Sequence, residues 1–440
     1  MSKGACLSSK KIEEFLYRVY DRLPRELKAL TRPAVWLFFS LRKIFFLASQ
    51  LRLPIYLIQG KEKWGGESLT TLYLGDERGL LFLSDLLYLA DPRKENLGKI
   101  FIWRIESRTN SHLPRSDLIF IKIDGFFSKS LSRGGLVIIP EWILFMLDLS
   151  RPLPELKKLP PNKSLRENLR IFRRHNYSYE ITHDPVKFKY FYDHMYYPYV
   201  MGRYGKITSG TDFKKMERIF RNGQLLLVKK GEDYISGLLI VRISREIMFA
   251  YSLGITEGSI EYLRAGALTA LYYFVILWAK ERGYKWLDFG ECRSFLNDGV
   301  LNYKKSWGME MKISRRLMNI FGMKICNFHS GVRNFLENKP FIFMDQEKLK
   351  GLILVGQNHP PTVEEVQSLV KTYSISGLDS LAILSDQGFT QQAEEFANSC
   401  STQRLQLIST KADAFFEAFP YLLQFCKSTV DETSVVEKRL

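Results

Sequence analysis

The stretch Ala265–Arg282 constrains the fold most, because it is apolar around most of its circumference when drawn as a helix. A helix of that kind has to be buried on most of its sides. Gly283 ends the apolar pattern, and the strand-like run Trp286–Gly290 follows at once. A buried helix that runs directly into a short apolar strand predicts a layered α/β fold rather than a helical bundle.

The residues before this helix read as strands. Gln224–Lys229 and Ile235–Ile243 form a hairpin pattern around the turn residues Gly231-Glu232-Asp233. Met248–Gly254 reads as a further strand, and Tyr179–Thr182 as another one upstream. Between them, Lys187–Tyr199 predicts an aromatic-rich helix.

The 440 residues divide into parts of different texture, as expected for two or three domains. Residues 1–55 read as a basic amphipathic helical segment, and residues 56–150 as a mixed α/β lobe. A proline-rich linker, Leu149–Pro161, leads to the unit of residues 162–335, which contains the buried helix. Residues 341–440 alternate strand and helix patterns, which predicts a small α/β domain with a parallel sheet. The fold class is therefore α/β with mixed sheets.

Short apolar runs broken by turn residues mark the lobe of residues 56–150. These runs are Thr71–Leu74, Leu80–Leu83, Ile100–Ile105, Leu118–Ile123 and Leu136–Ile139. In the last domain the strand runs are Leu352–Val355, Ser380–Leu384 and Leu405–Ile408, and the helix runs are Thr362–Lys371, Thr390–Ser399 and Ala412–Gln424.

The charge is unevenly distributed. The chain carries a net +17, whereas residues 341–440 hold 8 Lys and Arg against 13 Asp and Glu, so the first 340 residues carry +22. A field of this sign attracts anions such as nucleic acid, acidic lipid headgroups or a phosphate-bearing cofactor. Hydrophobic residues make up 46% of the chain, which argues against wholesale disorder.

The N-terminal region has no secretory signal pattern, because no small-residue cleavage site follows an apolar core. The most apolar segment, Ala34–Leu51, is interrupted at its centre by Arg42 and Lys43. Each of these charges disfavours membrane insertion by about 2.5–3.5 kcal/mol, so we do not expect a spanning helix. The segment suits either a helix packed on its own domain or a helix lying on an acidic membrane surface.

Cysteine and histidine give no metal or disulfide pattern. The five cysteines are scattered and never spaced as CxxC, and the six histidines form no HExxH motif. We therefore expect no metal, and a reducing cytoplasmic location, with peripheral contact at the inner membrane as a further expectation.

Three groups of residues carry a resemblance to a known family. They are the basic helix Leu165–His175 leading into Tyr177–Thr182, the aromatic run Phe191–Tyr199, and Asp288-Phe289-Gly290 followed by Tyr303-Lys304-Lys305-Ser306-Trp307-Gly308. Together they resemble the GNAT acyltransferase superfamily, and within it the FemAB/CelD-like branch of proteins built from two GNAT-like halves. The resemblance covers about Asp117–Lys312.

The resemblance implies two GNAT-like lobes plus the small C-terminal domain, and transfer of an acyl group from acyl-CoA, such as acetyl-CoA, to an amine. In that family the donor diphosphate lies at the start of the central helix, where backbone N–H groups are free. The matching positions are Arg264, Ala265, Gly266 and Ala267, although Gly266 also suits close packing of the helix on a sheet.

The catalytic candidates follow the same resemblance. Lys304 matches the lysine of the Fem-type Phe-Lys-x-x-Phe-Gly motif, and Tyr303 precedes it, although a lysine doublet is also typical of a solvated surface. Acylation of an amine needs a base, for which Asp288 and Glu291, beside Gly290, are the candidates. An ordinary salt-bridged loop remains the alternative for these acids.

The substrate-binding candidates lie in two loops. Arg203 and Tyr204 follow the break at Pro198, and Arg293 and Asp298 follow the strand with the two acids. The substrate is expected to be a small-molecule or lipid-linked amine of a cell-envelope or polysaccharide precursor, in a bacterial protein. Two alternatives stay open: a Fem-type transferase using aminoacyl-tRNA, and a non-catalytic GNAT-like scaffold that binds a membrane surface or nucleic acid.

Overall fold

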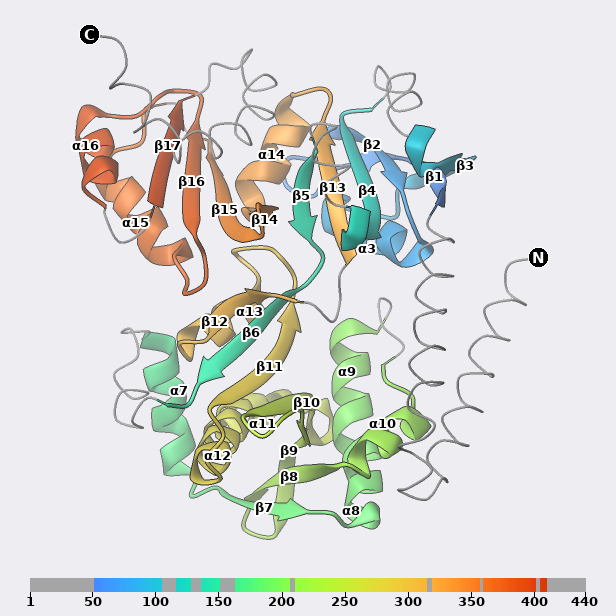
Figure 1. Cartoon of the computed structure of the whole chain (residues 1–440), viewed down its shortest axis with the longest axis vertical. Helices are drawn as coiled ribbons and strands as arrows, with labels where there is room; N and C mark the ends of the chain where they lie inside the picture. Colours follow the sequence, from blue (N-terminus) through green and yellow to red (C-terminus); the bar gives the residue numbers. More distant parts are fainter. Residues whose placement is uncertain are drawn as a thin grey trace. The chain divides into compact units, whose positions relative to one another are not determined.

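The computed structural model in Figure 1 describes residues 51–104, 116–127, 136–150, 163–205, 210–314, 319–356, 359–400 and 404–409. The chain forms two compact units. One holds the described residues 51–53 and 99–104, and the other holds the remaining described residues. The expected helical segment before residue 51, most of the linker and the expected helix Ala412–Gln424 lie outside the described residues.

Six strands form the first sheet, in the order β3-β1-β2-β4-β13-β5. They are β1 (Arg52–Lys61), β2 (Ser68–Leu74), β3 (Arg93–Phe101), β4 (Leu118–Asp124), β5 (Val137–Pro140) and β13 (Asn319–Ile325). The apolar run Leu80–Leu83 belongs to helix α3 (Glu77–Leu87), whose buried face shares a core with Phe120 and Val137. Asp76 caps this helix by accepting a hydrogen bond from the Gly79 amide.

Seven strands form the second sheet, in the order β12-β6-β11-β10-β9-β8-β7. They are β6 (Ile143–Asp148), β7 (Ser178–Thr182), β8 (Gly223–Lys230), β9 (Asp233–Arg242), β10 (Ile247–Ile255), β11 (Trp286–Cys292) and β12 (Glu310–Ile313). The expected hairpin is confirmed as β8 and β9, which pair antiparallel. The expected buried helix is α12 (Ala267–Glu281), in which ten of the 15 residues are buried.

Six further helices belong with this second sheet. They are α7 (Lys163–Arg174), α8 (Pro185–Tyr190), α9 (Tyr197–Tyr204), α10 (Phe213–Phe220), α11 (Ile260–Arg264) and α13 (Gly299–Ser306). A π-helical turn, Phe191–Tyr196, joins α8 to α9, so the expected aromatic helix is confirmed with one wider turn. Strand β10 passes close to this turn at Gly254, where a Cβ atom would lie 2.5 Å from the Tyr196 nitrogen.

The first two sheets exchange strands with each other (Figure 1). β5 stays in the first sheet, but β6, which follows it, lies beside β11 in the second. β12 stays in the second sheet, but β13, which follows it, pairs with β4 and β5 in the first. Each sheet also contains one parallel pair, β2 with β4 and β10 with β11. Helix α3 and strand β3 connect the first pair, and helices α11 and α12 connect the second. The two sheets are thus similar around the parallel pair, although one has six strands and the other seven. The division of the chain near residue 150 stays a prediction.

A third sheet, β14-β15-β16-β17, belongs to the C-terminal region. It contains β14 (Phe341–Asp345), β15 (Lys348–Val355), β16 (Ser380–Ser385) and β17 (Arg404–Ser409), with helices α14 (Ser330–Asn338), α15 (Val363–Tyr373) and α16 (Gln391–Ser399). β15, β16 and β17 are parallel, as expected, and β14 is antiparallel to β15. The mixed α/β fold class is confirmed. No helix within the described ranges is long and apolar enough to cross a membrane.

Candidate active site

The second sheet opens between its two central strands. β10 and β11 pair in parallel only at Ile247–Phe249 with Trp286–Asp288. Beyond that point β10 continues along β9 as far as Ile255, whereas β11 continues along β6 as far as Cys292. The carboxyl ends of adjacent parallel strands therefore separate, and ligands of α/β proteins bind outside such ends.

The N-terminus of α12 follows β10. Gly266 takes a left-handed conformation with φ of 87°, and no side chain caps the helix there. The other three residues expected to bind the donor lie on either side of Gly266. Arg264 is the exposed last residue of α11, and Ala265 is the C-cap of that helix. Ala267 is buried and is the first residue of α12. The structure therefore supplies a long helix with an uncapped first turn, which favours anions.

Tyr303 lies against this first helical turn. Its hydroxyl is 3.3 Å from the Thr269 hydroxyl, and its ring packs edge-on to Tyr272 of α12, with centroids 5.1 Å apart. Burial raises the pKa of Tyr303 to about 12, and neighbouring Tyr199 adds to the rise. The phenol is therefore protonated at neutral pH and can donate a proton or a hydrogen bond.

A buried tryptophan adjoins the same phenol. Trp307 is 5% exposed and its ring centroid lies 6.3 Å from that of Tyr303. The Trp307 side chain hydrogen-bonds the Tyr303 hydroxyl, and this contact partly opposes the effect of burial on the pKa of Tyr303.

Arg203 is connected to Tyr303 by way of Tyr199. Its guanidinium donates a hydrogen bond of 2.7 Å to the hydroxyl of Tyr199, the residue that also raises the pKa of Tyr303. Tyr204 is the last residue of α9, but its side chain lies outside the described part of the chain. The structure thus brings Arg203 and Tyr303 to one neighbourhood.

The two acidic candidates differ in exposure. Asp288 is 2% exposed, and its carboxylate accepts a hydrogen bond of 2.8 Å from the Gly290 amide within its own strand. Glu291 is half-buried, and its carboxylate accepts a hydrogen bond from the Ser314 hydroxyl at 3.1 Å. Of the two, Glu291 is better placed to meet a substrate, and Asp288 holds the strand.

Lys304 is buried rather than solvated. Its ammonium group donates to the carbonyl oxygens of Gly290 at 3.0 Å and Glu291 at 3.1 Å, and it lies 5.3 Å from the ring centre of Phe145. Burial lowers the pKa of Lys304. The lysine therefore fixes the end of β11, where Gly290 has a φ of 72° and the pairing with β6 is irregular.

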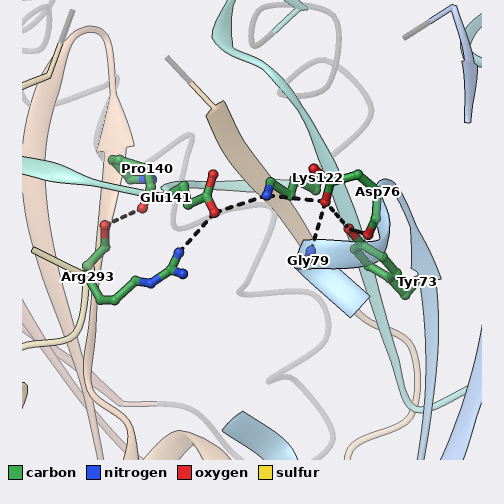
Figure 2. A network of polar contacts seen from close by, with 8 residues as sticks. Tyr73, Asp76, Gly79, Lys122, Pro140, Glu141 and Arg293 are labelled. Carbon is green, nitrogen blue, oxygen red and sulfur yellow. Dashed lines mark hydrogen bonds and ion pairs between the residues drawn. The ribbon is translucent and has the colours of Figure 1, made fainter. Parts of the chain in front are cut away.

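Arg293 belongs to a network of polar contacts that includes Glu141 and Lys122 (Figure 2). Its guanidinium lies 3.9 Å from the ring centres of both Phe82 and Trp142, and 3.0 Å from a Glu141 carboxylate oxygen. Burial lowers the pKa of Arg293, and Glu141 opposes this effect. The structure therefore places Arg293 in this network, and of the other candidates Asp298 interacts with it electrostatically.

The network continues to the first parallel pair. The Lys122 ammonium on β4 lies 3.0 Å from the same Glu141 oxygen and 3.3 Å from the carboxylate of Asp76, the cap of α3. Burial raises the pKa of the adjacent Tyr73, whose hydroxyl donates to the Asp76 carbonyl at 2.9 Å. The helix terminus of the first sheet is thus occupied by a carboxylate and an ammonium group from the chain itself, unlike the terminus of α12.

Asp298 and Cys292 have local structural roles. Asp298 caps α13, accepting hydrogen bonds from the amides of Val300 at 2.9 Å and Leu301 at 3.0 Å. Burial raises the pKa of the nearby Cys292 thiol to about 12, so it is an unreactive packed residue. Within the described residues, no cluster of three or more His, Cys, Asp or Glu side chains is suited to hold a metal ion.

The sequence missed several residues of this region. Thr269 and the pair Lys122–Glu141 do not stand out in the sequence. The position of Thr269 could have indicated its role, because it stands three residues after Gly266 and so in the first turn of the helix. Nothing in the sequence indicates the roles of Lys122 and Glu141, because their partners are distant in sequence.

No family model matches this chain, and no curated protein matches its sequence. Many solved structures are similar to part of it. One, described as the C-terminal domain of a lysylphosphatidylglycerol synthetase from Agrobacterium fabrum, is 12% identical, with 65% of this chain and 84% of that chain covered and a TM-score of 0.32.

Another is a GCN5-related N-acetyltransferase from Sphaerobacter thermophilus, at 11% identity, with 60% and 78% coverage and a TM-score of 0.28. A third is a GNAT family acetyltransferase with acetyl-CoA bound, from Elizabethkingia anophelis, at 16% identity, with 34% and 98% coverage and a TM-score of 0.23. With TM-scores this low, these likenesses carry no argument about activity, so the function proposed next depends on the motifs and geometry of the chain itself.

Proposed function

We propose that this chain is a GNAT-like N-acyltransferase that transfers an acyl group from acyl-CoA to an amine, in a cell-envelope or polysaccharide precursor. The observation that carries the proposal is the uncapped first turn of α12 beside the separated ends of β10 and β11. Acyl-CoA would supply an activated thioester. The backbone N–H groups that follow Gly266 are the groups that would hold its diphosphate.

The side chains around this turn are the candidates for the acid, the base and the substrate-binding residue. Tyr303 keeps its proton at neutral pH, because burial raises its pKa to about 12, and so it is the residue to protonate a leaving group. Trp307 packs beside this phenol and helps to bury it. Glu291 is the candidate base, and Arg203 a candidate for binding the substrate.

Of the first two sheets in the described part of the chain, the second suits this role. In the first sheet, the equivalent helix terminus is capped by Asp76, and Lys122 lies 3.3 Å from that carboxylate. An anionic donor would have to displace a carboxylate from a partly buried ion pair there, which is unfavourable. We therefore infer that the second sheet, and not the first, holds the donor site, although the two sheets are similar around their parallel pairs.

A second candidate changes the donor to aminoacyl-tRNA, as the resemblance to the FemAB-like branch implies. The charge of +22 on the first 340 residues favours this reading, because phosphate contacts dominate affinity for nucleic acid. A third candidate, a non-catalytic scaffold, is favoured by the burial of Asp288 and Lys304, which both bond within the chain.

Equilibrium binding with radiolabelled acetyl-CoA separates these three functions. Saturable binding that tRNA does not displace supports the acyl-CoA reading. Binding of aminoacyl-tRNA without acetyl-CoA binding moves the donor to tRNA. Absence of both supports the scaffold.

A further inference from the structure

An aromatic pair stands exposed in the smaller unit of the chain. Phe101 is 39% exposed and Trp103 is 64% exposed. Their rings stack on each other, with centroids 4.7 Å apart and planes inclined by 16°. Leaving two large aromatic side chains in water is unfavourable, so an exposed pair of this kind indicates a surface that meets a partner.

Basic residues lie beside this pair, one of them over a ring and two close to it in the sequence. Arg52 lies over the Phe101 ring, with its guanidinium carbon 5.5 Å from the ring centre, and Lys99 and Arg104 are both exposed. The described residues of this unit, 51–53 and 99–104, include no acidic residue. We call Arg52, Lys99, Phe101, Trp103 and Arg104 the aromatic–basic patch.

We propose that the aromatic–basic patch docks the protein on an anionic lipid bilayer. Trp and Phe partition into the headgroup boundary of a membrane, while Arg and Lys beside them pair with lipid phosphates. The sequence adds charge of the same sign, because residues 1–53 contain 11 Lys and Arg against 4 Asp and Glu. The expected interfacial helix Ala34–Leu51 belongs to this same segment of the sequence.

The ring geometry favours a bilayer over nucleic acid. A protein that binds single strands offers free aromatic faces on which bases stack. Here Trp103 stacks on Phe101, and Arg52 lies over Phe101 as well, so the faces of that ring already have partners. The edges and exposed surfaces of the pair remain available to lipid.

Vesicle flotation of the full chain tests the proposal. The vesicles are phosphatidylcholine alone, or phosphatidylcholine and phosphatidylglycerol in equal parts. Binding to the mixed vesicles is expected, with little to phosphatidylcholine alone and release by added salt. Trp103→Ser combined with Phe101→Ser should abolish it, and Arg52→Gln should weaken it about fivefold.

A matched control is Val186→Ser, which removes a side chain that is 74% exposed but lies outside the patch. It should bind like the wild type, and circular dichroism should show every variant folded. Equal binding by the aromatic variant would overturn the proposal and place the contact elsewhere, for example in residues 1–50. Binding of tRNA but not vesicles, lost in the same variant, would overturn it in favour of nucleic acid.

The outcome is independent of the proposed acyl transfer. The patch shares no residue with the site on the second sheet, so acetyl-CoA binding should be unchanged in the Trp103 and Phe101 variant. Loss of vesicle binding with acetyl-CoA binding retained would support the docking surface alone.

Discussion

The Lys304 ammonium donates a 3.0 Å hydrogen bond to the carbonyl oxygen of Gly290, across the end of β11. This contact gives Lys304 a structural role within the chain, because it holds the strand that borders the proposed donor site. Its second bond, to the Glu291 carbonyl at 3.1 Å, fixes the residue that carries the candidate base.

Replacing Lys304 should therefore reduce stability as well as activity. Lys304→Met keeps the length of the side chain but leaves two buried carbonyl groups without their donor, so we expect a loss of about 1–3 kcal/mol in urea denaturation. Lys305→Met is the matched control, because Lys305 donates to the Thr372 carbonyl in an exposed contact. A Lys304 variant as stable as the control would show that the contact is not structural.

The lowered pKa of Lys304 also predicts how the free energy of unfolding changes with pH. Burial lowers the pKa of Lys304 in the folded state, so between that pKa and the ordinary lysine value the unfolded chain binds more protons. The free energy of unfolding of the wild type should rise with pH in this window relative to Lys304→Met. Urea denaturation at several alkaline pH values measures the difference, and a parallel decline of both proteins would contradict it.

The raised pKa of Tyr303 predicts the opposite change of stability with pH. Its pKa rises from 10.0 to about 12 on folding, so between these values the folded state keeps a proton that the unfolded chain has lost. Stability should fall over this range, and less so in Tyr303→Phe. If Tyr303 is the acid of the reaction, the variant should also lose about 100-fold or more in kcat, with little change in donor affinity.

Gly266 should matter for binding beyond its effect on stability. Gly266 and Gly283 have φ of 87° and 75°, so alanine at either position is expected to cost about 1–2 kcal/mol. Gly283 lies at the far end of α12, with open space where a Cβ would stand. Thermal denaturation should show similar losses for both variants, whereas only Gly266→Ala should weaken acetyl-CoA binding.

Glu141 should be a major determinant of stability. One of its oxygens lies 3.0 Å from both Lys122 and Arg293, and removing one partner of a buried charge pair typically costs about 3–5 kcal/mol. Glu141→Gln should approach this loss in urea denaturation. Glu310→Gln, which breaks an exposed pair with Lys312 at 3.6 Å, should change stability by less than about 1 kcal/mol. Equal effects would contradict the assignment.

Much of the second sheet could be predicted from sequence, because its signals are local. The hairpin of β8 and β9 follows from alternating apolar residues around a glycine turn, and α12 from its nearly continuous apolar surface. The parallel strands of the C-terminal sheet were predicted in the same way. Helix α3 was less clear, because its four-residue apolar run has no distinct period.

The strand exchange could not be predicted. β6 and β13 are short apolar strands, and nothing in their residues indicates which sheet they join, because strand pairing depends on contacts distant in sequence. The side-chain roles failed for the same reason. Arg293 and Lys304 look alike as basic loop and helix residues, yet distant partners, Glu141 for one and Gly290 for the other, decide what each does.

The most direct test of the proposed function is calorimetric titration of the full chain with acetyl-CoA at low and moderate salt. We predict saturable binding at one site per chain, lost in Gly266→Glu, because a carboxylate at the start of α12 would repel the diphosphate, and retained in Gly283→Glu. Absence of binding at both salt concentrations, or equal binding by Gly266→Glu, would contradict a donor site at the N-terminus of α12.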